Sequence, residues 1–123
     1  MKRILVVDDK EKIRNVYTSL LKAEGFEVSE ASSAVDAWEI LKKEPIPIID
    51  LILLDIKMPK VEGDDLYEII RAFHKRVKVI VASVYPVDEQ KRIIKDAADY
   101  YDKSQGIDVL VSKIRKVLQE CSN

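Results

Sequence analysis

Residues 50–59, DLILLDIKMP, decide the fold, because they join an apolar run to an acidic residue and a turn. Residues 51–54 are an unbroken apolar run, too short for an ordinary helix and typical of a strand buried on both faces. Pro59 and Gly63 prevent a simple continuation of the strand. The strand therefore ends at Asp55, and sites in open parallel sheets are built where strands end.

The rest of the chain repeats the pattern of a strand followed by a helix. We expect further strands at residues 4–7, 26–31, 77–82 and 100–103. Between them, apolar residues recur at the three- and four-residue spacing of a helix. The residues that mark these helices are Ile13, Val16, Tyr17, Leu20 and Leu21; then Ala34, Ala37, Trp38 and Leu41; then Leu66, Ile69, Ile70 and Phe73; then Ile93, Ile94, Ala97 and Ala98; and finally Leu110, Ile114, Val117, Leu118 and Cys121.

Strict alternation of strands and helices predicts an α/β fold with a parallel sheet that helices cover on both faces. Right-handed crossovers leave few arrangements, and the common five-stranded one has the flavodoxin-like strand order 2-1-3-4-5. Turn residues fit these boundaries: Gly25 ends the first helix, and Ser32 or Ser33 caps the second.

The composition is that of one ordinary globular domain, so residues 1–123 are expected to form a single unit. The chain has 21 basic and 22 acidic residues, and its net charge of −1 gives no reason to expect binding to nucleic acid or to an anionic membrane. No signal peptide is recognisable, and the single cysteine, Cys121, excludes an internal disulfide. We expect a cytoplasmic protein that is a monomer or a weak dimer.

The expected strand order gathers polar residues at one rim of the sheet. Asp8 and Asp9 end the first strand, Asp55 ends the third, Ser83 follows the fourth and Lys103 ends the fifth. Three neighbouring carboxylates repel one another unless a cation compensates, and Mg²⁺ prefers carboxylates, waters and phosphate oxygens. Such a site suits an aspartate nucleophile that forms an aspartyl phosphate while a lysine binds the phosphoryl oxygens.

Each of these residues has a simpler interpretation when it is taken alone. Asp8 and Asp9 favour the positive start of a helix, Asp55 suits a turn, and Ser83 suits a loop or cap. Lys103 alone is a surface lysine. The hypothesis of a phosphoryl site therefore rests on the convergence of separate segments at one rim.

The chain resembles, from end to end, the receiver domain of bacterial two-component response regulators. The resemblance is carried by ILVVDD in the first strand, LILLDIKMPKVEG in the third, VASVY in the fourth and ADYYDKS in the fifth. It implies that Asp55 accepts a phosphoryl group from the phosphohistidine of a histidine kinase or a phosphotransfer protein. It also implies Mg²⁺ binding by Asp8, Asp9, Asp55 and the backbone carbonyl of Lys57.

The same resemblance implies a switch rather than an enzyme, one that assists only its own phosphotransfer and dephosphorylation. Ser83 matches the hydroxyl that moves towards the phosphoryl group, and Tyr100 matches an aromatic residue that then swings inward. Lys103 matches the phosphoryl-binding lysine. A downstream protein would read the face formed by the fourth helix, the fifth strand and the last helix. Lys57 and Tyr85 flank the acceptor and match positions that tune the phosphoryl lifetime.

Three features depart from the family pattern. Val84 stands where the family usually has Ala or Gly, and its branched side chain is expected to narrow access to Asp55. Ser104 stands where the family has a proline, so a trans bond or a shifted Lys103 is expected. Ser83 and Lys103 are 103 − 83 = 20 positions apart, which is short for the family and indicates a trimmed fourth helix or trimmed loops.

Three other functions compete with a phosphorylated switch. The main alternative is a receiver-like interaction module that works without phosphorylation, which Val84 and the missing proline keep open. An aspartate-dependent magnesium phosphatase similar to the haloacid dehalogenases would need an acid–base Asp where this chain has Lys57. A flavin carrier of the same fold would need a phosphate-binding loop where this chain has the acidic DDKEK.

Overall fold

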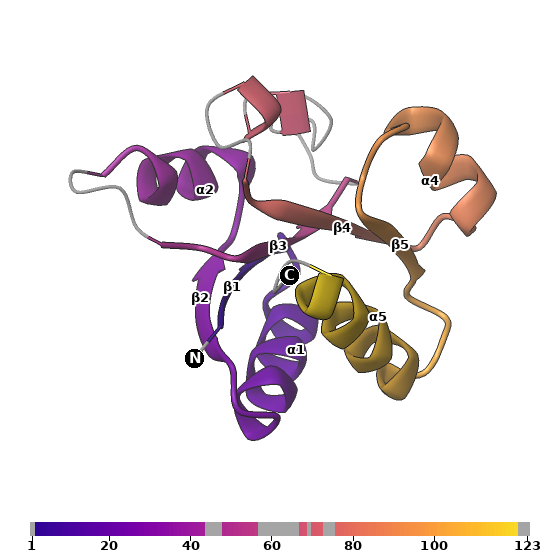
Figure 1. Ribbon diagram of the computed structural model, residues 1–123, viewed down its shortest axis with the longest axis horizontal. Helices are drawn as coiled ribbons and strands as arrows, with labels where there is room; N and C mark the ends of the chain where they lie inside the picture. The colour runs from indigo at the N-terminus through magenta and orange to yellow at the C-terminus, as the bar shows by residue number, and fades with distance from the viewer. Residues whose placement is uncertain (1, 44–47, 57–66, 69, 73–75, 121–123) are drawn as a thin grey trace.

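The computed structural model describes residues 2–43, 48–56, 67–68, 70–72 and 76–120 (Figure 1). Several residues of the sequence predictions lie outside this part of the chain: Lys57, Pro59, Gly63, Leu66, Ile69, Phe73 and Cys121. The helices and strands are β1 (Arg3–Val7), α1 (Glu11–Ala23), β2 (Glu27–Ala31), α2 (Ala34–Leu41), β3 (Leu51–Asp55), β4 (Lys78–Ser83), α4 (Val87–Ile93), β5 (Asp99–Asp102) and α5 (Ile107–Glu120).

The five strands form one parallel sheet in the order β2-β1-β3-β4-β5, which confirms the predicted topology. The register of the strands determines which strand ends lie next to each other. Val7 of β1 pairs with Leu54 of β3, and Ser83 of β4 pairs with Asp102 of β5. The residues that follow the paired ends are therefore brought to the same edge of the sheet, as parallel strands require.

Helices cover both faces of the sheet, and each face has its own apolar core (Figure 1). One core packs α2, Tyr67 and Ile70 against the sheet, and the other packs α1 and α5 against the opposite face. All five residues of β3 are buried, as a strand covered on both faces requires. Among the described helices, none is long and apolar enough to cross a membrane.

Two helix boundaries follow from local chemistry that the sequence predicted. Gly25 has a φ of 95°, in the left-handed region that glycine adopts without a Cβ clash, and it ends α1. Ser33 caps α2, and its hydroxyl accepts a hydrogen bond of 3.0 Å from the Asp36 amide. The Asp36 carboxylate accepts hydrogen bonds from Ser32, and these hold the Asp36 pKa below its usual value.

Helix α4 is shorter than the apolar spacing predicted. It ends at Ile93, and Ile94 already has an extended backbone. Of the four residues expected to face inward, Ile94 is buried and Ala97 is half-buried, but Ile93 and Ala98 are exposed. The prediction was wrong for these two because it assumed that the helix continues to Ala98. Whether α4 or its flanking loops are shorter than in relatives, as the spacing of Ser83 and Lys103 indicated, stays a prediction.

Candidate functional site

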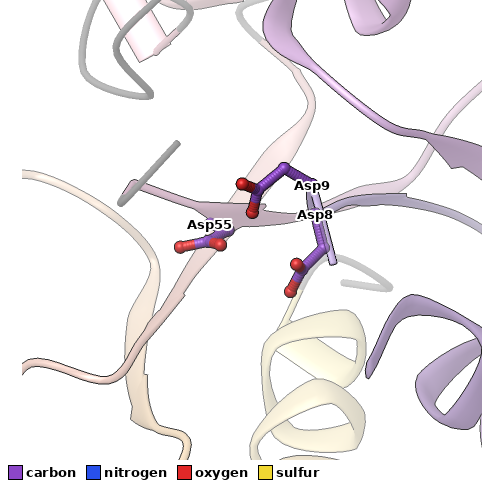
Figure 2. Close-up of side chains that lie close together, drawn as sticks. All are labelled: Asp8, Asp9 and Asp55. Carbon is purple, nitrogen blue, oxygen red and sulfur yellow. The ribbon is translucent and has the colours of Figure 1, made fainter. Parts of the chain in front are cut away.

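Three carboxylates meet at the carboxyl ends of β1 and β3, as the strand order predicted. One oxygen from each of Asp8, Asp9 and Asp55 can be chosen so that all three lie within 4.8 Å of one another (Figure 2). The side chains of Asp8 and Asp55 are each only 3% exposed. Buried carboxylates this close repel one another strongly, so the site requires compensating positive charge.

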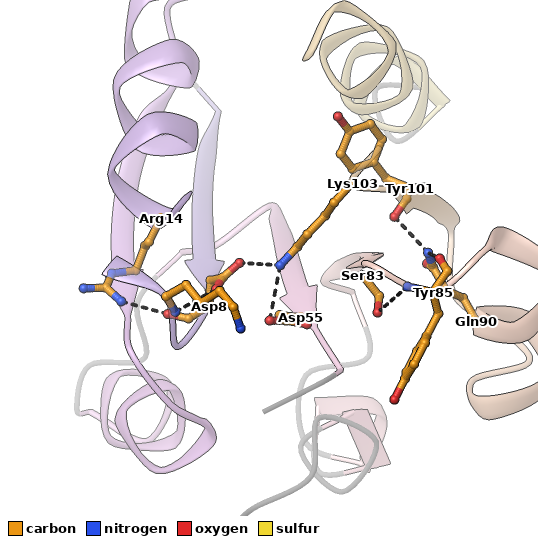
Figure 3. A network of polar contacts seen from close by, with 9 residues as sticks. Asp8, Arg14, Asp55, Ser83, Tyr85, Gln90, Tyr101 and Lys103 are labelled. Atoms are coloured by element: carbon orange, nitrogen blue, oxygen red, sulfur yellow. Dashed lines mark hydrogen bonds and ion pairs between the residues drawn. The ribbon is translucent and has the colours of Figure 1, made fainter. Parts of the chain in front are cut away.

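Lys103 supplies part of that charge from the position directly after β5, the strand on the far side of β4. Its Nζ lies 2.7 Å from Asp8 Oδ2 and 3.3 Å from Asp55 Oδ2 (Figure 3). The lysine side chain is itself 8% exposed, so the solvent screens these contacts weakly. Among the described residues, the cluster still sets three carboxylates against one ammonium, so the charge of a further cation would be favourable there.

Asp9 gives the most specific sign of where a cation would bind. Its Oδ1 is buried and has no hydrogen-bond partner within the described part of the chain. An unpartnered buried carboxylate oxygen is costly unless a cation or donor reaches it. Carboxylate oxygens are the ligands that Mg²⁺ prefers, so the residues present fit this ion.

Arg14 of α1 holds the acidic loop in place, and sequence reasoning missed it. Its Nη1 donates to the backbone carbonyl of Asp8 at 2.8 Å, and its Nε donates to Glu30 Oε1 of β2 at 3.2 Å. Asp8 Oδ1 also accepts from the Lys10 amide at 2.9 Å. The sequence shows that Arg14 follows the acidic pair by a few residues. It does not show that the guanidinium turns back to the Asp8 carbonyl.

Ser83 is fully buried at the end of β4, next to the β3 end that carries Asp55. Its carbonyl accepts the Lys103 amide at 2.9 Å, which ties the lysine backbone to β4. Its hydroxyl oxygen accepts from the Tyr85 amide at 3.2 Å. The structure thus brings together Asp8, Asp9, Asp55, Ser83 and Lys103, as the sequence predicted.

The turn after β5 is fixed without the proline that the family pattern has. The Asp102 carboxylate accepts from the Ser104 amide at 2.8 Å and from the Ser104 hydroxyl at 2.7 Å. These two bonds hold the Asp102 pKa below its usual value, the amide bond contributing most. Ser104 therefore orders this turn through its hydrogen bonds, and Lys103 still reaches the carboxylates.

Tyr100 does not belong to the carboxylate cluster. Its side chain lies in the apolar core that also contains α2, Tyr67 and Ile70. It is 6% exposed, and its hydroxyl donates to the Ile94 carbonyl at 2.6 Å and accepts from the Ala97 amide at 3.2 Å. Burial raises the Tyr100 pKa, and the Ala97 bond opposes that rise. The resemblance implied an inward swing on phosphorylation, whereas this structure already holds Tyr100 inward.

An apolar groove of about 540 Å³ adjoins the lysine side of the cluster. Its walls are Lys12, Ile13, Val16, Tyr17, Val84, Lys103 and Ser104. Val16 and Val84 are 53% and 55% exposed, and both line this groove, so they give it an exposed apolar surface. Val84 thus forms part of the groove wall, while its predicted effect on access to Asp55 stays a prediction.

Comparison with known proteins places this geometry in a family. A family model described as "Response regulator receiver domain" matches residues 4–115. The chain is 33% identical to the chemotaxis protein CheY of Treponema pallidum, covering 95% of this chain and 83% of that protein. It is 35% identical to the CAI-1 autoinducer sensor kinase/phosphatase CqsS of Vibrio cholerae, where the match covers 92% of this chain and 17% of that longer protein.

Solved structures agree with the sequence comparison. A CheY-like response regulator receiver domain from Methanospirillum hungatei has a TM-score of 0.90 and 31% identity, with 99% of this chain and 97% of that one covered. The response regulator TrrA from Thermotoga maritima, in complex with Mg²⁺ and BeF, has a TM-score of 0.83 and 34% identity, with 95% and 99% covered.

Proposed function

Because this chain belongs to the response regulator receiver family, which signals by phosphorylation, we propose that it is a switch whose acceptor is Asp55. The observation that carries the proposal is the position of Lys103, whose ammonium contacts both Asp8 and Asp55. An ammonium beside a buried carboxylate nucleophile is placed to bind the oxygens of an arriving phosphoryl group.

The proposed reaction transfers a phosphoryl group from a phosphohistidine of a partner protein. An Asp55 carboxylate oxygen forms a bond to phosphorus, and the bond from phosphorus to the imidazole nitrogen breaks, with its electron pair returning to the imidazole. Lys103 holds one phosphoryl oxygen by charge, and the Ser83 hydroxyl donates a hydrogen bond to another. The chain assists only this transfer and the later hydrolysis.

Mg²⁺ is the cofactor that fits the cluster. Asp8, Asp9 and Asp55 would hold it, and the Lys57 backbone carbonyl is proposed as a further ligand outside the described residues. When bound, the ion would neutralise the charge of the carboxylates and of the phosphoryl oxygens. The orphaned Asp9 Oδ1 supports this assignment, as does the Mg²⁺ in the related TrrA structure.

The apolar groove beside Lys103 is the proposed docking place for the phosphohistidine protein. Its exposed valines, Val16 and Val84, would bury apolar surface against the partner and leave the histidine facing the carboxylates. After phosphorylation, a downstream protein would bind the face of α4, β5 and α5. The switch is proposed to act as a monomer or a weak dimer, with Tyr85 and Lys57 tuning the phosphoryl lifetime.

A second candidate function is an interaction module that works without phosphorylation. The observation in its favour is Tyr100, which is buried and bonded to the α4–β5 connection. A face that keeps this arrangement whether or not Asp55 is phosphorylated could bind its partner at all times. The two candidates differ in whether Asp55 takes a phosphoryl group.

Intact mass spectrometry separates them. The protein is incubated with acetyl phosphate and Mg²⁺, and the wild type is compared with Asp55→Asn and with the matched control Asp88→Asn on α4. A gain of one phosphoryl mass in the wild type and in the control, absent from Asp55→Asn and without Mg²⁺, supports the switch. A wild type that gains no phosphoryl mass, and that binds its partner with the same affinity with and without acetyl phosphate, supports the constitutive module.

A further inference from the structure

Gln90 is the buried residue of α4 among those described, and it is a polar one. Its exposed fraction is 0%, whereas the neighbouring Glu89 and Lys91 are exposed. Long polar side chains are seldom fully buried unless hydrogen bonds hold them. Its position calls for a role that an ordinary apolar side chain would not fulfil.

The amide group of Gln90 joins two segments that are distant in the sequence. Nε2 donates to the Tyr85 carbonyl at 2.8 Å and to the Tyr101 carbonyl at 2.9 Å. The amide orientation follows from these partners, since the reverse would place Oε1 against two carbonyl oxygens. Tyr101 belongs to β5, the edge strand of the sheet, so one side chain connects α4, the loop after β4 and the sheet edge (Figure 3).

The Tyr85 backbone is shared between Gln90 and the phosphoryl site. Its amide donates to the Ser83 hydroxyl, and its carbonyl accepts from Gln90. The Gln90 backbone continues the connection, because its own carbonyl accepts the Ile94 amide at 2.9 Å at the end of α4. The Ile94 carbonyl in turn accepts the Tyr100 hydroxyl. Four hydrogen bonds, joined through the covalent structure of Tyr85, Gln90 and Ile94, therefore connect Ser83 to Tyr100.

We propose that Gln90 is the positioning residue that couples the phosphoryl site to α4 and to the edge strand β5; this inference rests on the proposed function. When the Ser83 hydroxyl turns towards a phosphoryl group, its hydrogen bond with the Tyr85 amide breaks and the backbone at Tyr85 shifts. Gln90 is bonded to the Tyr85 carbonyl and to the Tyr101 carbonyl, so α4 and β5 shift with it. An apolar residue would fill the same space without pulling on either carbonyl.

The buried Oε1 of Gln90 has no hydrogen-bond partner in the described residues. A lone buried acceptor opposes folding, so the side chain is not optimal for stability alone. We expect Gln90→Met, which keeps the length and removes both the unpartnered acceptor and the two hydrogen bonds of the amide, to fold with a melting temperature below that of the wild type. Gln119→Met, an exposed glutamine on α5, is the matched control.

The test titrates each ¹⁵N-labelled protein with Mg²⁺ and beryllofluoride, a phosphoryl mimic, and records backbone amide shifts by NMR. In the wild type and in Gln119→Met, we expect shifts at residues 8, 9, 55 and 83 and at residues 87–93 and 99–102. In Gln90→Met, the shifts at residues 8, 9, 55 and 83 should remain. The shifts at residues 87–93 and 99–102 should fall to less than half of their size in the wild type. Full-size shifts at α4 and β5 in Gln90→Met overturn the coupling.

Failure of the proposed function gives a different result, because beryllofluoride added to the wild type already saturated with Mg²⁺ would then cause no shift at residues 8, 9, 55 and 83. A second measurement does not depend on a folded variant. The two side-chain amide protons of Gln90 are followed in the wild type during the same titration. A change in both resonances that tracks the site amides supports the coupling, and unchanged resonances alongside full site shifts contradict it.

Discussion

The Lys103 Nζ lies 2.7 Å from Asp8 Oδ2, although the two residues are 95 positions apart in the chain. The contact spans the sheet from β5 to β1, and Asp55 on β3 lies within reach of the same ammonium. Its geometry sets the charge balance of the site within the described part of the chain, where one ammonium faces three clustered carboxylates. The first prediction follows from that imbalance.

Replacing Asp9 with asparagine should stabilise the fold and remove metal binding. The substitution relieves repulsion among buried carboxylates, and we expect the free energy of unfolding to rise by about 1 kcal/mol in metal-free urea titrations. Addition of Mg²⁺ should stabilise the wild type but not Asp9→Asn. Asp88→Asn, on the exposed start of α4, is the control. A lower free energy of unfolding for Asp9→Asn than for the wild type, both without metal, would contradict repulsion among the carboxylates.

Removing Arg14 should weaken metal binding without changing any carboxylate. Its guanidinium holds the Asp8 carbonyl, so Arg14→Ala should raise the Mg²⁺ dissociation constant about tenfold, as loss of a residue that supports ligands commonly does. Calorimetry measures the constant. Arg115→Ala, which breaks the exposed ion pair with Glu24, is the control and should leave it unchanged. Equal affinity in Arg14→Ala and the control would exclude a supporting role.

Tyr100→Phe should loosen the connection between α4 and β5. It removes the hydrogen bonds of the hydroxyl with Ile94 and Ala97 and should cost about 1 kcal/mol of unfolding free energy. Hydrogen exchange of the Ala97 amide should accelerate as well. Tyr101→Phe, whose hydroxyl bonds Gln105 and Gly106, is the matched control and should leave the Ala97 amide protected. Unchanged Ala97 exchange in Tyr100→Phe would refute this account.

Four tyrosines should make the fold sensitive to alkaline pH. Burial is the largest cause that raises the pKa of Tyr17, Tyr67, Tyr100 and Tyr101 above the usual value near 10. Since a raised pKa in the folded state favours the protonated form, this stability is complete below pH about 10 and is lost above it. Phenolate absorbance should therefore rise together with loss of helical circular dichroism. Full ionisation of the folded protein near pH 10 would contradict these shifts.

Sequence patterns predicted the fold and the carboxylate cluster because both depend on strand order. Apolar runs ending in Asp8, Asp55 and Ser83 determine where strands stop, and parallel pairing places those ends together. Lys103 was predicted on the same basis. The third helix is described only at residues 67–68 and 70–72, which are helical and include the buried Ile70. The rest of that helix and the Lys57 carbonyl lie outside the described residues and stay predictions.

Side-chain bonds that cross between elements could not be read from spacing. Arg14 turns back to a carbonyl, Gln90 bridges two carbonyls, and Ser104 bonds Asp102 where a proline was expected. Ile93 was predicted to be buried because apolar spacing continues past the end of α4. These hydrogen bonds and the exposure of Ile93 depend on where a helix or strand ends and on how the backbone turns there. Hydrophobic periodicity does not encode either feature.

The most direct test of the central claim maps the phosphoryl group to a residue. The protein is treated with acetyl phosphate and Mg²⁺, reduced with borohydride, digested and sequenced by tandem mass spectrometry. Reduction of an aspartyl phosphate converts the aspartate to homoserine. If Asp55 is the phosphoacceptor, position 55 alone is read as homoserine, and no homoserine appears when acetyl phosphate is left out. Labelling at Asp8 or Asp9, or at no aspartate, would contradict Asp55 as the phosphoacceptor.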